Sequence, residues 1–163
     1  MLKDRRHDYR LSLSTADFFS EVLERALLTS PEVHEAGSGL QNRKQDKRII
    51  VYELFDQETG PFYFCLSVAK PEGDLDQADL AFIRKVFTNI IALDDAARAI
   101  PSHCDENEEL FEICVDAAAG MVVLDYSSTL WNTEWGVHFR MTDSGGFERL
   151  GIPDWKSPGQ FIR

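Results

Sequence analysis

The sequence predicts an α+β fold: two main helices pack on a mostly antiparallel sheet of about five to seven strands that ends in a C-terminal β-meander. Three observations lead to this prediction. Polar and apolar residues alternate along residues 108–150, aromatic and β-branched residues concentrate in residues 48–68, and apolar residues recur at helical spacing in 14–27 and 76–99.

The length and composition of the chain indicate one packed domain. A chain of 163 residues can bury about 70% of its unfolded surface and needs no disulfide or metal to fold. Eleven Phe, four Tyr and three Trp favour a core over disorder. We therefore expect a single domain over 1–163, with residues 1–10 frayed and residues 32–47 forming a mobile loop with a weak strand near Val33.

The stretch from Glu108 to Leu150 carries the clearest strand pattern. Its period of two gives each strand one face for a core and one for solvent or a partner. Turns are predicted at 117–120 and 143–146, where glycine adopts positive φ readily. The residues expected to face the core are Phe111, Ile113, Val115, Val122, Leu124, Tyr126, Trp135, Val137, Phe139 and Met141.

Upstream of the meander, the sequence predicts a hairpin and two helices. The hairpin pairs residues 48–55 with 61–68, the most aromatic part of the chain. The first helix runs from an N-cap at Ser14 to Leu27, and the second is expected as one helix over 76–99, capped by Asp74 or Asp76. The apolar stripe of this second helix is wide enough to cover a sheet and the first helix together.

The net charge of −11 is the strongest global signal. It is uneven, because residues 49–163 hold eight Lys and Arg against twenty Asp and Glu. Such a field repels nucleic acid and anionic membranes and attracts a basic protein. We therefore expect a protein partner, basic in charge, and neither nucleic acid nor membrane. The alternative is that the acidic balance only keeps the protein soluble.

The motif content argues against an enzyme. The sequence has no P-loop, GxGxxG or nucleophile elbow, and its four histidines are scattered, so we expect no catalytic residues, no metal site and no cofactor. The carboxylates of 108–125 could include an acid–base pair, but we expect them to form a solvated acidic face.

The cysteines indicate a reducing compartment. There are three, without CxxC spacing, and Cys65 and Cys114 fall within strand patterns, where we expect buried, inert thiols. The charged residues that open the sequence are not followed by an apolar segment, so we expect no signal peptide and a cytoplasmic location.

Three segments of the meander carry a resemblance to a functional class: 110–115 (LFEICV), 121–126 (MVVLDY) and 132–139 (NTEWGVHF). In this small, acidic, aromatic-rich chain they resemble bacterial immunity proteins that neutralise toxins of contact-dependent or type VI secretion systems. The resemblance implies one cognate toxin bound in the cytoplasm. The contacts we predict from charge and alternation are Glu108, Glu109, Glu112, Asp125, Glu134 and His138, with Trp131 as an aromatic anchor.

Two other functions stay open at this point. A secretion chaperone or adaptor would bind a client protein as a dimer, using the apolar stripe of 76–99. A small-ligand-binding domain or enzyme would use the aromatic hairpin of 49–68 as a pocket.

Overall fold

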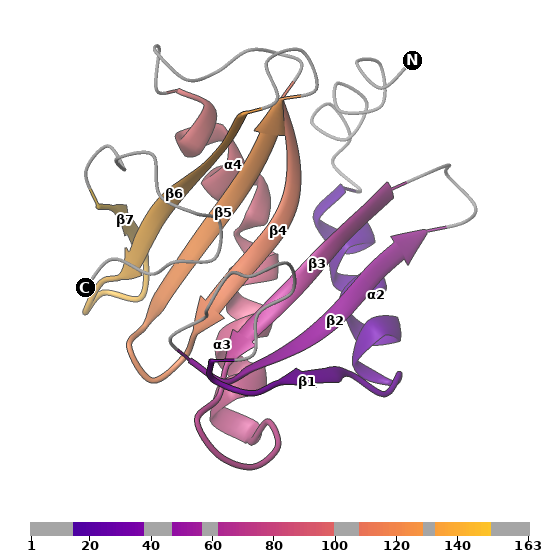
Figure 1. Ribbon diagram of the computed structural model, residues 1–163. Helices are drawn as coiled ribbons and strands as arrows, with labels where there is room; N and C mark the ends of the chain where they lie inside the picture. Colours follow the sequence, from indigo (N-terminus) through magenta and orange to yellow (C-terminus); the bar gives the residue numbers. More distant parts are fainter. Residues whose placement is uncertain (1–14, 38–46, 57–61, 100–107, 129–132, 151–163) are drawn as a thin grey trace.

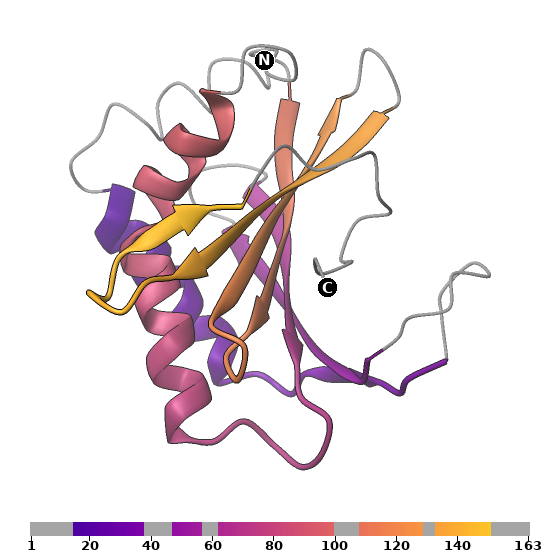
Figure 2. The ribbon, with the colours of Figure 1, turned by 90° about the vertical axis from the view of Figure 1, so that its left-hand side faces the viewer.

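A computed structural model of the chain describes residues 15–37, 47–56, 62–99, 108–128 and 133–150. Within these residues, three helices lie on one face of a seven-stranded sheet, which confirms the predicted α+β class and adds a helix (Figures 1 and 2). The helices are α2 (Thr15–Leu27), α3 (Gln77–Thr88) and α4 (Ile90–Arg98). The strands are β1 (Glu32–His34), β2 (Ile49–Asp56), β3 (Phe62–Ala69), β4 (Glu108–Asp116), β5 (Met121–Ser128), β6 (Thr133–Met141) and β7 (Phe147–Arg149). Residues 1–10, Ser14 and most of the predicted 32–47 loop lie outside the described residues.

The strands follow one another across the sheet in chain order, β1 to β7. Neighbours are antiparallel except β3 and β4, which run parallel and are connected through α3 and α4. Their pairing joins 65–68 to 112–115, and the two strands diverge toward their N-terminal ends (Figure 1). The predicted hairpin, the weak strand at Val33 and the C-terminal meander are all confirmed. Positive φ angles at Gly120 and Gly145 confirm the two predicted turns.

The prediction of one helix over 76–99 is wrong, because the chain breaks at Asn89 into α3 and α4. The Asn89 side chain donates a hydrogen bond to the Lys85 carbonyl at 2.8 Å, and its backbone leaves helical geometry at φ −101° and ψ 7°. The predicted cap at Asp76 is confirmed. Asp76 and Asp79 each accept a hydrogen bond from the other's backbone N–H at 2.9 Å, forming a capping box. Among the described residues, no helix has the length and hydropathy needed to cross a bilayer.

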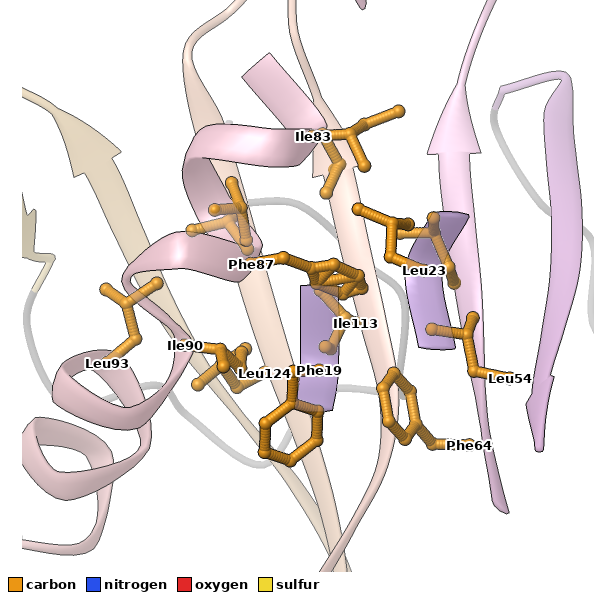
Figure 3. Close-up of a cluster of buried hydrophobic side chains, with 14 of the residues drawn as sticks. Phe19, Leu23, Leu54, Phe64, Ile83, Phe87, Ile90, Leu93, Ile113 and Leu124 are labelled. Carbon is orange, nitrogen blue, oxygen red and sulfur yellow. The ribbon is translucent and has the colours of Figure 1, made fainter. Parts of the chain in front are cut away.

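The core lies between the helices and the sheet, and its centre is aromatic (Figure 3). Phe64 of β3 packs between Phe19 of α2 and Phe87 of α3, with ring centroids 6.2 Å apart in both pairs. The apolar stripe of α3 and α4 faces this core, as predicted. Its buried members are Phe82, Ile83, Val86, Phe87, Ile90, Leu93 and Ala97.

A β-bulge near the start of β4 corrects the predicted alternation. Leu110 pairs with Tyr126 and Glu112 pairs with Asp125, so Phe111 is an extra residue that has no pairing partner on β5. Leu110 packs against the core in place of Phe111. From Ile113 onward the alternation runs as the sequence predicts, with Ile113 and Val115 fully buried on the helix side.

The aromatic centre of the core gives a first prediction. Phe64→Ala should lower the free energy of unfolding by about 3–5 kcal/mol, because it opens a cavity between two helices and the sheet. Urea unfolding followed by circular dichroism measures this change. Leu28→Ala is the control: Leu28 is 89% exposed, so its replacement should change stability by less than about 0.5 kcal/mol. Equal effects of the two substitutions would contradict this description of the core.

Candidate functional site

The sheet face opposite the helices, here called the second face, carries buried polar side chains. Each strand residue that alternates with a core residue points to this face. Three of its members are almost inaccessible: Asp125 is 0% exposed, His138 1% and Cys114 2%. Val123, on the same face, is 1% exposed, so the centre of the sheet is buried on both sides.

Glu112, Cys114 and Asp125 converge on the second face and are called the second-face cluster below. Each offers a carboxylate oxygen or the thiol sulfur, and these three atoms lie within 4.8 Å of one another. The Cys114 thiol donates to Oδ2 of Asp125 at 3.4 Å. From the neighbouring strand β3, the Ser67 hydroxyl donates to Oε1 of Glu112 at 2.5 Å and so orients that carboxylate.

Two backbone features bring the cluster together. The bulge at Phe111 places Glu112 directly opposite Asp125 and turns it away from the core side that Leu110 occupies. On β6, Gly136 pairs with Asp125. A Cβ at Gly136 would lie 2.5 Å from Oδ1 of Asp125, so only glycine leaves space for this carboxylate.

The electrostatics of the cluster favour a protonated thiol. Burial raises the pKa of Cys114 well above its ordinary value, and the negative charges of Asp125 and Glu112 raise it further. A thiol held in this state is a poor nucleophile. Two carboxylates and a thiol at this spacing can instead share a proton or coordinate a cation.

The expectation of a solvated acidic face on the meander is wrong for Asp125, which is buried, and the predicted partner contact His138 is buried as well. The prediction fails because the second face of the sheet is buried as well as the helix-covered face, so a polar residue that points to it is not necessarily exposed to solvent. Glu112 is part-buried and hydrogen-bonded to Ser67. Glu108 and Glu109 belong to β4 and Glu134 to β6, but their side chains lie outside the described part of the structure, as does Trp131.

A different surface gathers exposed carboxylates: the end of the sheet where β1 and the β3–α3 loop meet, low in Figure 1. Arg48 joins these segments, because its guanidinium donates to the Glu35 carboxylate at 3.2 Å and to the carbonyls of Lys70 and Gly73 at 2.9 Å. This surface, here called the acidic end, consists of five exposed acids: Glu32, Glu35, Glu72, Asp74 and Asp76.

The cations described near the acidic end each pair with a carboxylate. Arg48 holds Glu35, and Lys70 donates to Asp76 at 3.2 Å and to the buried Asp79 at 2.7 Å. Hydrogen bonds from the Asp79 backbone and from Lys70 lower the pKa of Asp76, so this acid is ionised at neutral pH. Lys47, next to Arg48, pairs with Asp116 at 2.7 Å, so among the described residues seven carboxylates face three cations and the acidic end carries a net negative charge.

The prediction that Trp135 lies in the core is confirmed. Trp135 is buried and stacks on Tyr126, with ring centroids 4.5 Å apart. The Tyr126 hydroxyl donates to Asp94 of α4 at 2.6 Å, and Arg98 donates to the same carboxylate at 2.8 Å. These contacts attach α4 to the meander.

Comparison with protein-family models, with curated proteins and with solved structures found no match.

Sequence patterns missed both the second-face cluster and the acidic end. A signal for the cluster was present, because Val123 is apolar on the face expected to be solvated and Gly136 interrupts a strand of bulky residues. The acidic end had a weaker signal in the closely spaced acids of 72–76, since its other members lie about forty residues earlier in the sequence.

The burial of the two described cysteines gives a second prediction. Cys114 is buried as expected, whereas Cys65 is only part-buried. In the folded protein, iodoacetamide should modify Cys65 well before Cys114, because the latter is inaccessible and its pKa is raised. Peptide mass spectrometry after timed alkylation measures both rates, and alkylation in urea is the control in which the rates should converge. Similar rates in the native protein would contradict the described burial.

Proposed function

We propose that this chain is an immunity protein that neutralises one cognate bacterial toxin in the cytoplasm by binding it through an acidic surface. The observation that supports this proposal is the acidic end, with its five exposed carboxylates. It replaces the second face as the proposed contact surface, because Asp125 and His138 are too buried to touch a partner.

The acidic end suits a basic protein partner. Arg48 and Lys70 tie β1, β2 and the β3–α3 loop together, so the carboxylates are presented from anchored backbone. A surface that is organised before binding loses little conformational freedom in the complex. Its negative potential would also steer a basic toxin, with association rate constants of up to about 10⁸–10⁹ M⁻¹s⁻¹ at low salt. A polyanion such as nucleic acid would be repelled by the same field.

The described residues give the two alternatives less support. The stripe on 76–99, which suggested a chaperone dimer, is buried within the chain, where Ile83, Phe87 and Ile90 face the sheet (Figure 3). The aromatic hairpin, which suggested a ligand pocket, contributes Tyr52 and Phe64 to the same core. Binding of a protein partner through charge therefore remains the function that the described geometry supports best.

Charge reversal at the acidic end tests the proposal. The partner is first recovered on tagged protein from native lysate, identified by mass spectrometry and tested for toxicity when expressed alone. Glu72→Lys/Asp74→Lys should then slow association with this partner by roughly tenfold or more at low salt, and the difference should shrink as salt screens the charges. Surface plasmon resonance at several salt concentrations measures the rates.

A matched control separates a local contact surface from overall charge. Asp143→Lys/Glu148→Lys makes the same change in charge on exposed residues at the opposite edge of the sheet. It should slow association far less. Equal slowing by both double variants would show that only net charge matters, and a captured partner that is not toxic would remove the immunity proposal.

The burial of the apolar stripe gives a further prediction about assembly. The purified protein should be a monomer of about 18.6 kDa by light scattering coupled to gel filtration, because α3 and α4 direct their apolar face to their own sheet. The measurement is repeated over a wide range of protein concentration. A stable dimer would favour the chaperone alternative.

A further inference from the structure

The second-face cluster offers three donor atoms of two types that metal ions use in proteins, two carboxylate oxygens and one thiol sulfur. Glu112 and Cys114 are two residues apart on β4 and therefore point to the same side, and Asp125 stands opposite Glu112 on β5. Their donor atoms lie within 4.8 Å of one another, close enough for small side-chain rotations to bring all three onto one ion. This juxtaposition depends on the bulge at Phe111, a feature found at the functional sites of many sheets.

Gly136 shapes the same place from β6, because the Asp125 carboxylate occupies the space that a side chain at this position would need. A strand interior favours bulky residues, and glycine there marks a close approach of a ligand or of another backbone. The neighbours of Gly136 on β6, Trp135 and Val137, are both large and buried. The missing side chain leaves space for Oδ1 of Asp125, on the carboxyl group whose other oxygen meets the Cys114 thiol.

The donor set identifies the class of ion. A thiolate with two carboxylates suits Zn²⁺ and related divalent transition ions, whereas Mg²⁺ and Ca²⁺ prefer six or more oxygen ligands. Three protein ligands with a part-buried Glu112 on the solvent side leave a fourth position for water. The Ser67 hydroxyl, which bonds Glu112, would hold that ligand in place from outside the coordination sphere.

We propose that Glu112, Cys114 and Asp125 form a binding site for one zinc-class divalent ion on the second face of the sheet. On binding, the Cys114 S–H bond breaks, the proton passes to solvent, and the resulting thiolate forms a bond to the ion while the two carboxylates each supply an oxygen. The charge of the ion balances the thiolate and one carboxylate. The site is independent of the proposed partner surface, since the two involve different residues.

Cobalt provides the direct test, because a Co²⁺–thiolate bond gives an intense near-ultraviolet absorption that oxygen ligands do not. The reduced full-length protein is titrated with Co²⁺ and then with Zn²⁺, and Mg²⁺ serves as a negative control. We expect one equivalent of Co²⁺ to produce the thiolate band, Zn²⁺ to displace it and Mg²⁺ to leave it unchanged. Absence of a saturable thiolate band in the wild-type protein would overturn the proposal.

Substituted proteins show which residues give rise to the thiolate absorption band. Cys65→Ser/Cys104→Ser keeps Cys114 as the single thiol and should retain the band, whereas Cys114→Ser should lose it. Ser67→Ala should retain the band but weaken Zn²⁺ affinity roughly 10- to 100-fold, as expected for a residue that orients a ligand. A band that survives Cys114→Ser, or disappears in Cys65→Ser/Cys104→Ser, would place the ion elsewhere and overturn the proposal.

A further variant keeps the test valid if Cys114→Ser does not fold. Glu112 is part-buried, so Glu112→Gln preserves its shape and its bond to Ser67 while removing a charged ligand. It should reduce Zn²⁺ affinity at least about tenfold, by analogy with other ligand and supporting positions. Unchanged affinity in a folded Glu112→Gln protein would contradict the site.

Discussion

Burial of both faces of β4 and β5 is the constraint on which the rest of the structure depends. A strand at the centre of a sheet has no solvent-facing side when both faces are covered, so every polar group on it needs an internal partner. On the helix side, Ile113 and Leu124 meet this requirement by being apolar. On the second face, Glu112, Cys114 and Asp125 meet it through mutual contact and through Ser67.

Local patterns predicted much of the fold because the physics behind them is local. The alternation from Ile113 onward reflects the geometry of a single strand, and the cap at Asp76 needs only the backbone three residues away. The break at Asn89 escaped prediction because asparagine is only mildly unfavourable within a helix, and a run of apolar residues on both sides masks the interruption. The bulge at Phe111 escaped it because register is a property of two strands together.

The candidate sites were harder to predict because they are properties of distance in space. Nothing in the sequence around Asp125 distinguishes a solvated carboxylate from a buried one, since its exposure depends on what covers the second face. The acidic end depends on Arg48, whose hydrogen bond to Gly73 spans 25 residues of sequence. Charge composition predicted an acidic surface, whereas the place where exposed carboxylates gather depends on the three-dimensional arrangement of β1 and the β3–α3 loop.

The extra residue in β4 makes the length of this strand as important as its composition. Substitution of Phe111 changes one side chain, and its deletion would leave Leu110 opposite Tyr126 and Glu112 opposite Asp125 in a regular ladder, whereas a deletion elsewhere in β4 changes the register of the strand. If Ile113 were deleted and the bulge took up the loss, for example, Glu112 would stand opposite Leu124 and its carboxylate would enter the apolar layer beneath the helices. Variation in this part of the chain should therefore accept changes of residue type far more readily than single-residue gaps.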